Sequence, residues 1–249
     1  MLCLRLLRRS KNNRLKIRIL STSDPDVYKR QVINREDDMI LSSRLCHLFG
    51  HDEHAGRDGS YRITSLYFDT PDDRALRQKK DGVDRREKFR LRYYGSDTSF
   101  IRLEKKIKIN GLCAKDSAVL SRKETEKLLA GEYAFMAESE NALLVEFYSK
   151  IRTQLLRPKT VVVYDREAFV YSPANVRITL DRDIRTTAGT GCMNFLLCEP
   201  ALLKTEEKGI TVFEIKYDEF LPEIVRAAVQ LQNSKTGAYS KYASCRRFD

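Results

Sequence analysis

The sequence predicts an α+β domain in which antiparallel strands close into a β-barrel tunnel, with helices packed outside. Several segments alternate polar and apolar residues with a period of two, which is typical of β-strands. The polar positions of these segments are rich in Arg and Lys. Other segments have helical apolar spacing and can cover the apolar side of the strands, which leaves a charged interior.

The composition indicates a globular chain and limits the classes of molecule that it is expected to bind. The 249 residues are 42% hydrophobic and 33% charged, which excludes a disordered chain. The net charge is +11, but residues 1–31 contribute +7 of it and the remainder only +4. Function must therefore depend on where cations cluster. Nucleic acid is disfavoured, since no basic recognition helix or base-stacking platform is visible.

The N-terminal segment, residues 1–31, differs from the rest of the chain. It is basic and apolar and contains no acidic residue before Asp24, so it resembles an organellar targeting segment. An untrimmed or misread start is the preferred explanation. We therefore predict that residues 1–31 lie outside the fold and that residues 32–249 form one domain.

The cysteine spacing and the hydropathy of the chain indicate its cellular compartment. The six Cys are scattered without a CxxC motif, which predicts reduced thiols and a cytoplasmic protein. Cys46, His47, His51 and His54 match no common zinc spacing, so a helix end followed by a polar loop is preferred over a zinc site. No apolar run approaches the roughly 18 residues of a membrane span. Any membrane coupling would then come from a partner membrane protein.

Helices are predicted from capping residues and apolar spacing. Asn34 begins the first, which ends at Gly50, and a short helix follows over 72–80. Ser121 and Glu124 form a capping box before a helix that ends at Gly131. A longer helix spans about 141–156, and the last spans about 222–231.

A hairpin of two basic strands, over 87–94 and 100–108, is the centre of the predicted sheet. The turn between them contains Gly95, Ser96 and Asp97. One face of the first strand carries Lys88, Arg90 and Arg92, and one face of the second carries Arg102, Glu104, Lys106 and Lys108. Like charges on paired strands destabilise a sheet, so this face requires an anion, or is simply a solvated outer face.

The same pattern recurs further along the chain. Strands predicted over 61–69, 160–170, 176–181 and 211–217 place Arg166, Arg177, Glu214 and Lys216 at alternate positions. A charged interior is stable when cations pair with acids, stay hydrated or hold an anion. Phosphate suits Arg and Lys, and Glu104 with Glu214 would hold Mg²⁺ or Mn²⁺ beside it.

Seven short motifs in order resemble one family. They are Tyr67-Phe68-Asp69-Thr70, Arg90-Leu91-Arg92-Tyr93-Tyr94, Leu103-Glu104-Lys105-Lys106, Tyr164-Asp165-Arg166-Glu167-Ala168-Phe169, Val176-Arg177-Ile178-Thr179-Leu180-Asp181, Glu214-Ile215-Lys216-Tyr217 and Ser240-Lys241-Tyr242. Over about residues 32–249 the chain is similar to the vacuolar transporter chaperone (VTC) domain, the polyphosphate polymerase branch of the triphosphate tunnel metalloenzymes. The resemblance implies a basic antiparallel tunnel, ATP and polyphosphate as substrates, and a divalent metal.

The resemblance also implies roles for individual residues. The phosphate-binding and catalytic set is Arg90, Arg92, Lys106, Arg166, Arg177 and Lys241. Glu214 matches the metal ligand, with Lys216 beside it on the strand, and Glu104 is a second ligand inferred from its facing. Lys88, Arg62 and Ser240 are expected to line the substrate path, with a solvated or structural role as the alternative for each.

One departure from the family concerns the first strand. The family begins with Glu-x-Lys-Tyr before its first helix, and here Tyr28-Lys29-Arg30-Gln31 stands in that place. Arg30 can replace the lysine, but the glutamate is missing. Two other functions therefore stay open. One is hydrolysis of a triphosphate in the same fold, and the other is non-catalytic binding of polyphosphate or another polyanion.

Overall fold

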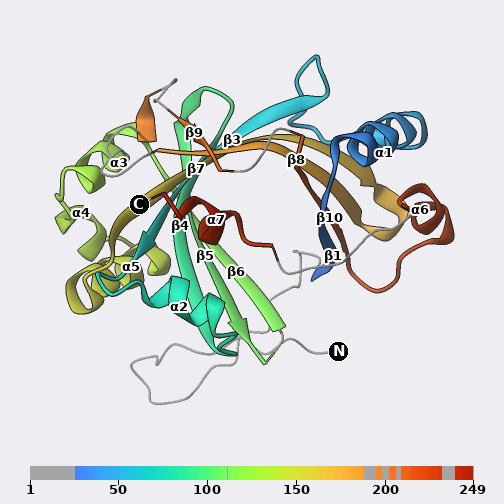
Figure 1. Ribbon diagram of the computed structural model, residues 1–249. Coiled ribbons are helices and arrows are strands. Elements are labelled where there is room, and N and C mark those ends of the chain that lie inside the picture. The colour runs from blue at the N-terminus through green and yellow to red at the C-terminus, as the bar shows by residue number, and fades with distance from the viewer. Residues whose placement is uncertain are drawn as a thin grey trace.

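A ten-stranded antiparallel sheet is the frame of the protein, with helices on both of its faces (Figure 1). The computed structural model describes residues 26–110, 112–187, 195–197, 202–205, 209–231 and 239–248. In chain order the elements are β1 (Asp26–Ile33), α1 (Arg35–Leu48), β2 (Gly50–His51), β3 (Ser60–Asp69), α2 (Arg74–Lys80), β4 (Arg86–Tyr94), β5 (Asp97–Ile109), β6 (Leu112–Leu120), α3 (Arg122–Leu129), α4 (Ala134–Ala137), α5 (Ala142–Gln154), β7 (Arg157–Tyr171), η1 (Ser172–Ala174), β8 (Val176–Thr186), β9 (Leu203–Lys204), β10 (Thr211–Tyr217), α6 (Glu223–Ala228) and α7 (Lys241–Cys245).

The sheet is not closed into a barrel. The strands pair in the order β1-β10-β8-β7-β3-β4-β5-β6, while β2 pairs with β7 and β9 with β8. Within the described residues β1 and β6 each have one partner strand, so the α+β class is confirmed and the closed tunnel is corrected to an open sheet. The β6 edge carries Lys115 and Asp116. Charged residues on an edge strand oppose further pairing.

The open sheet bends around α7. In Figure 1 α7 lies between β4–β6 on one side and β10 with β1 on the other. The pKa of Lys79 in α2 is lowered mainly by burial and also by the positive charges of nearby cations. These cations include Arg30 of β1 and Lys108 of β5, which come from opposite ends of the sheet. The two ends of the sheet thus approach the same region without backbone pairing. We call the sheet face that contacts α7 the inner face, and the opposite one the outer face.

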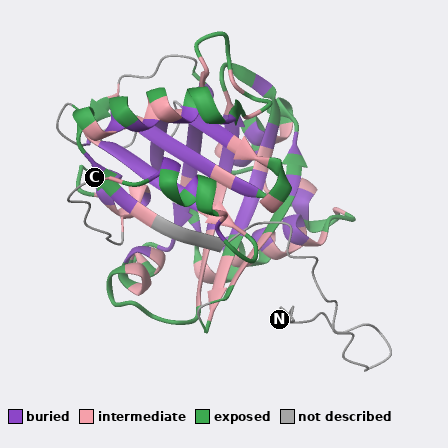
Figure 2. Cartoon of the chain, turned by 90° about the vertical axis from the view of Figure 1, so that its right-hand side faces the viewer, coloured by how far each residue is buried: buried purple, intermediate pink, exposed green. Residues whose placement is uncertain are grey.

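Apolar residues of the strands are packed beneath helices on the outer face. Beneath α3–α5 the core contains Phe68, Phe89 and Leu91 packed against Phe147. Beneath α1 and α6 it contains strand residues such as Phe169. Figure 2 shows buried residues concentrated in the strands, while the helices are exposed on their outer sides. Placing helices over the apolar face leaves the inner face to polar side chains.

A smaller apolar cluster lies on the inner face. Tyr61, Ile63, Tyr164 and Ala168 pack there with Cys245 of α7. This cluster seats α7 against β3, β7 and β8. The inner face is therefore partly apolar at its middle, which the alternation of charged residues does not predict.

Most elements predicted from local signals are present. Asn34, Ser121 and Asn141 each accept the capping hydrogen bond expected at a helix start. The β4–β5 hairpin turns at Gly95, whose φ of 59° favours glycine, and Tyr94 pairs with Asp97. The strands β2, β6 and β9 and the helices α4 and α7 were not predicted.

The N-terminal boundary is corrected in part. β1 covers residues 26–33 and pairs with β10, with one irregularity between Val27 and Lys29, so residues 26–31, predicted to lie outside the fold, belong to the sheet. The preceding residues, 1–25, lie outside the described residues. None of the helices that the structure describes is long and apolar enough to cross a membrane.

Replacing Phe147 by Ala tests the packing of α5 on the outer face. Its ring lies 5.0 Å from that of Phe68 and 5.2 Å from that of Phe89, centroid to centroid. We expect Phe147→Ala to lower the free energy of unfolding by about 3–5 kcal/mol in urea titrations. Phe220→Ala is the control, because Phe220 is 63% exposed and its loss should change stability by less than about 0.5 kcal/mol. Equal effects of the two substitutions would contradict this packing.

Candidate functional site

Strand alternation directs the basic residues of β4 toward the inner face. Phe89, Leu91 and Tyr93 are buried on the outer side, so Arg90 and Arg92 between them point inward. Arg90 donates to the Tyr67 hydroxyl at 2.9 Å. Arg92 is nearly buried and donates to Ser65 Oγ at 3.0 Å. Packing of the apolar half of β4 therefore fixes the position of its cationic half.

Glu104 on β5 neutralises these two arginines. Arg90 Nε donates to Glu104 Oε2 at 2.6 Å, and Arg92 Nη1 lies 3.8 Å from the same oxygen. Lys115 of β6 lies 2.8 Å from Oε1. Burial would raise the pKa of Glu104, but the nearby cations lower it far below its ordinary value. The carboxylate stays ionised, and both of its oxygens are engaged by cations.

Asp181 on β8 is the centre of a second cluster. Its carboxylate is fully buried and accepts two hydrogen bonds from Arg166, Nε to Oδ1 at 2.6 Å and Nη2 to Oδ2 at 2.9 Å. Lys241 Nζ of α7 lies 2.6 Å from Oδ2. Burial opposes ionisation, but Arg166 and Lys241 lower the pKa of Asp181 far below its ordinary value. This pairing fixes α7 to the sheet.

Tyr164 connects the two clusters. Arg92 donates to its hydroxyl at 3.3 Å. The Arg166 guanidinium and the Lys241 ammonium lie 5.4 and 4.8 Å from its ring centroid. Cations near an aromatic face are stabilised by its quadrupole. Cations from β4, β7 and α7 therefore meet around one buried aromatic ring on the inner face.

Glu214 on β10 forms a third cluster with β1. The register places Arg30 opposite Glu214, and both Nε, at 2.7 Å, and Nη2 of Arg30 donate to Glu214 Oε2. Lys216 Nζ lies 3.7 Å from Oε1. Although burial would raise it, Arg30 and the nearby lysines lower the pKa of Glu214 to about 2. Arg30 of the first strand thus pairs directly with the carboxylate predicted to hold a metal.

The remaining predicted residues lie at the margins of these clusters. Arg177 contacts Asp52 and donates to the Tyr61 hydroxyl at 2.8 Å. Lys106 is exposed and forms no ion pair with the other side chains that the structure describes. Ser240 caps α7 by accepting from Ala243 N at 3.3 Å, a structural role. The structure thus does not bring Lys106 and Ser240 into the three clusters.

Arg62 is corrected. Tyr61 pairs in register with Arg166, and Arg62 pairs with Asp165. Since neighbouring residues of a strand alternate faces, Arg62 lies on the outer face. Its Nε donates to Asp165 Oδ1 at 3.2 Å. Arg62 therefore pairs behind the sheet and does not line the inner face.

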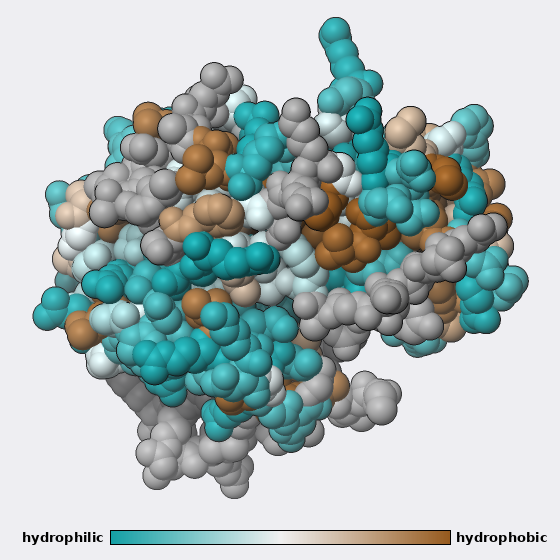
Figure 3. Space-filling model, viewed as in Figure 1, coloured by the Kyte–Doolittle hydropathy of each residue, from teal (hydrophilic) through white to brown (hydrophobic). Residues whose placement is uncertain are grey.

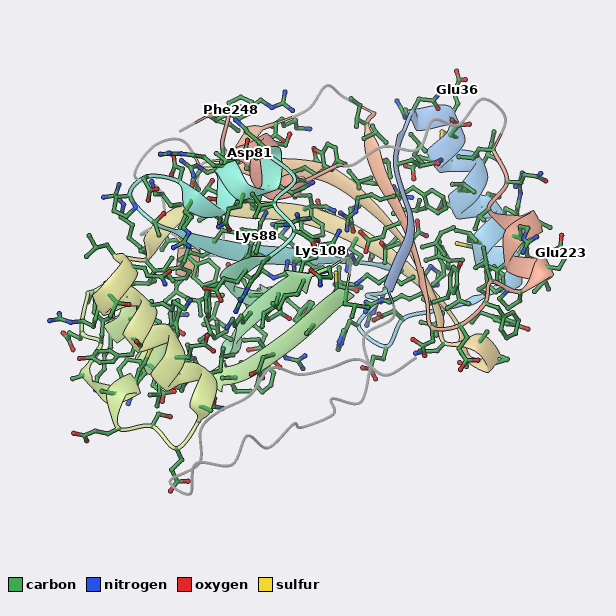
Figure 4. The ribbon with its side chains drawn as sticks, turned by 90° about the horizontal axis from the view of Figure 1, so that it is seen from below. Glu36, Asp81, Lys88, Lys108, Glu223 and Phe248 are labelled. Atoms are coloured by element: carbon green, nitrogen blue, oxygen red, sulfur yellow. The ribbon has the colours of Figure 1, made fainter. Side chains whose placement is uncertain are left out.

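An excess of cations gathers where the two ends of the sheet approach. Lys88 and Lys108 lie on neighbouring strands near α2 (Figure 4). Burial, with Lys79 and Arg86 close by, lowers the pKa of Lys88 to about 8, although Tyr67 acts in the opposite direction. Hydrophilic residues cover the surface around α2 (Figure 3). Crowded cations of this kind raise the affinity for an anion.

Several site residues were not predicted. Asp181 and Tyr164 were named within the family motifs, but no role was predicted for either. Lys115 belongs to β6, whose weak alternation gave no strand signal. Burial of these residues follows from contacts between distant segments, so the available signal was limited to their inward alternation with Arg166 and Arg177.

The carboxylates differ in their fitness to hold a metal. Both oxygens of Glu104 contact cations at 2.8 Å or less, whereas the ion-pair partner of Glu214 Oε1 among the described side chains is Lys216, at 3.7 Å. Mg²⁺ commonly takes one or two carboxylates and completes its shell with phosphates and water. Glu214 fits that use and Glu104 does not. In the described residues the one group of three potential ligands is Cys46, His51 and Glu167, on the outer face.

Comparisons with known proteins give one extensive match. The family model described as VTC domain matches residues 6–248. No curated protein matches the chain. A Bacillus halodurans structure described as a candidate adenylate cyclase aligns over 80% of this chain and 83% of its own, with 14% identity and a TM-score of 0.45. A Pyrococcus horikoshii protein aligns over 81% and 83%, with 13% identity and a TM-score of 0.39. At these TM-scores the two likenesses support no statement about fold or function.

Acid titration tests the ion pair of Glu214. Because its folded pKa is depressed from 4.5 to about 2, the pair contributes full stability above pH 4.5 and loses it as pH falls toward 2. The loss is on the order of 3 kcal/mol. In urea unfolding at pH 5, 4 and 3 we expect Glu214→Gln to show a shallower decline than wild type. Glu138→Gln, at an exposed position, should follow wild type. Parallel curves for wild type and Glu214→Gln would contradict the assignment.

Proposed function

Because this chain belongs to the VTC domain family, we propose that it is an ATP-dependent polyphosphate polymerase that works on the inner face of the sheet. The observation that carries the proposal is the meeting of Arg92, Arg166 and Lys241 around Tyr164, with Arg90 held beside them by Tyr67 and Glu104. These cations come from three elements and are oriented by buried carboxylates. A row of oriented cations suits a chain of phosphates better than a single small anion.

The chemistry requires little beyond positioning and neutralisation of charge. A terminal oxygen of the growing polyphosphate attacks the γ-phosphorus of ATP. A new P–O–P bond forms, the bond to the β–γ bridging oxygen breaks, and ADP leaves with that electron pair. The attacking oxygen is already ionised, so no general base is needed. The inner-face arginines and Lys241 hold both reactants and neutralise the equatorial oxygens.

A divalent metal belongs to this proposal through Glu214. The family resemblance implies Mg²⁺ or Mn²⁺, and both hydrogen bonds from Arg30 go to Oε2 of Glu214 and not to Oε1. When bound, the ion would supply further neutralisation of the phosphate oxygens. Arg30, Lys216 and Lys241 lower the pKa of this carboxylate to about 2 against the effect of burial, so it is ionised at neutral pH.

The cations near α2 suggest where the product chain lies. Lys79, Lys88 and Lys108, with Arg86 and Arg30, surround one region and repel one another. Polyphosphate passing there would relieve this repulsion. Its binding should therefore weaken as salt concentration rises.

A non-catalytic polyphosphate-binding module is the second candidate. Arg30 directs two N–H groups to Glu214 Oε2, where the family carries lysine, and the sheet is open. This arrangement reduces the oxygens that Glu214 offers to a metal and favours binding without turnover. The two candidates differ in whether ATP is consumed.

The direct test incubates the protein with ATP, Mn²⁺ and a short polyphosphate primer, and measures polymer length and ADP. We expect chain growth in wild type and a rate at least about 100-fold lower in Glu214→Gln, comparable to losing one preorganised electrostatic group. Glu219→Gln, at an exposed position of the same segment, is the matched control.

Other outcomes separate the alternatives. Phosphate release without chain growth would support a triphosphatase. Tight polyphosphate binding that survives Glu214→Gln, with no turnover in wild type, would support the binding module.

The pKa of Lys88 predicts a pH dependence of binding. With a pKa of about 8, Lys88 is mainly cationic at pH 7 and mainly neutral at pH 9. We expect tripolyphosphate affinity to fall by about five-fold over this range, for a charge interaction of ~1 kcal/mol. Lys88→Arg keeps the charge and should flatten the dependence. Lys123→Arg, at an exposed position of α3, should leave it unchanged. An unaltered slope in Lys88→Arg would exclude Lys88 from the binding path.

A further inference from the structure

Three potential metal ligands meet on the outer face of the sheet. Cys46 lies near the end of α1, His51 lies in β2, and Glu167 lies in β7. Pairing of β2 with β7 brings His51 beside Phe169, and packing of α1 brings Cys46 over the same strand. Arg166, the residue before Glu167, points to the inner face. The cluster is therefore separated from the proposed phosphate chemistry by the sheet.

The distances between the three ligand atoms match those around a tetrahedral zinc ion. Cys46 Sγ lies 3.8 Å from His51 Nε2 and 3.6 Å from Glu167 Oε1, and the latter two atoms lie 3.4 Å apart. Bond lengths of about 2.3 Å to sulfur and about 2.0–2.1 Å to nitrogen and oxygen, at tetrahedral angles, give separations of about 3.6, 3.6 and 3.4 Å. A metal ion would fit with little movement of the side chains.

Surrounding residues hold two of the ligands in place. The His51 ring packs on Phe169 with centroids 4.7 Å apart. Gly59, at φ 77°, makes room for it, because a Cβ there would lie 2.7 Å from His51 Nε2. Ser42 Oγ and Arg182 Nη2 both donate to Glu167 Oε2 at 2.7 Å. Outer contacts of this kind orient metal ligands, and here they leave Oε1 directed at Cys46 and His51.

The sequence signal for this cluster was incomplete. Cys46, His47, His51 and His54 were considered together, and a polar loop was preferred. His47 contacts Ser43 O and His54 stacks on Tyr94, so neither joins the cluster. Glu167, which completes it, lies more than a hundred residues further along the chain.

We propose that Cys46, His51 and Glu167 bind one Zn²⁺ ion, with a fourth position filled by water. Thiolate, imidazole and carboxylate together favour zinc over Mg²⁺ or Ca²⁺, which prefer oxygen ligands. Cys46 and His51 are exposed, so solvent reaches the fourth position. The Cys46 thiol releases its proton to solvent on binding. The ion would join α1, β2 and β7 on the sheet face opposite the phosphate-binding face.

Cobalt titration of the chelator-treated full chain tests the proposal. Co²⁺ should bind one equivalent with a thiolate-to-cobalt charge-transfer band and intense tetrahedral d–d bands, and Zn²⁺ should abolish both signals. Cys46→Ser should remove the charge-transfer band, which separates this thiol from the other five cysteines. His51→Asn should weaken binding by at least about 100-fold, since loss of an outer contact alone weakens it by about 10- to 100-fold.

Matched controls use residues outside the cluster. Cys113→Ser and His47→Ala should titrate as wild type. Both ligand positions substituted are exposed, so circular dichroism should show a folded chain in each variant. An absent charge-transfer band in wild type, or one that persists in Cys46→Ser, would overturn the proposal. The His51–Glu167 contact would then be an ordinary polar contact.

Discussion

The structure depends on buried carboxylates that hold cations in place on one face of the sheet. Asp181 is fully buried, and an ionised group in that position is stable only because Arg166 and Lys241 surround it. Removing both partners would leave an uncompensated buried charge. Glu104 and Glu214 do the same for cations from β4, β6 and β1. The Arg30–Glu214 and Lys241–Asp181 pairs join segments distant in sequence, so these charges help to fix both the fold and the site.

The two faces of the sheet have different roles: the outer face packs against helices, and the inner face carries the charged clusters. The apolar outer face is covered by helices α1, α3–α5 and α6. The strands therefore need no large hydrophobic core on the inner side. The small apolar patch that remains there seats α7, which brings Lys241 to Asp181 and Tyr164. The outer face is not purely apolar, since Arg182 joins Asp38 and Glu167 behind β8. Polar networks on opposite faces can therefore carry separate functions.

Local features were predictable and non-local ones were not. Period-two alternation located Arg90, Arg92 and Glu104 on one face, because that pattern is fixed by the strand itself. Caps at Asn34, Ser121 and Asn141 are equally local. The sequence does not show which strand edges pair with one another. The open sheet and the Arg30–Glu214 pair could therefore not be predicted from it. Arg62 was misplaced for the same reason: alternation gives relative facing within β3, and the apolar contacts of Ile63 decide which side is inner.

The most direct measurement records arginine side-chain Nε–Hε signals by NMR during titration with tripolyphosphate. Arg90, Arg92 and Arg166 should shift together at one affinity, because they face a common region. Arg152 and Arg226, exposed on α5 and α6, should stay unchanged. Shifts spread equally over exposed arginines, with the three inner ones unaffected, would contradict a polyanion site on the inner face.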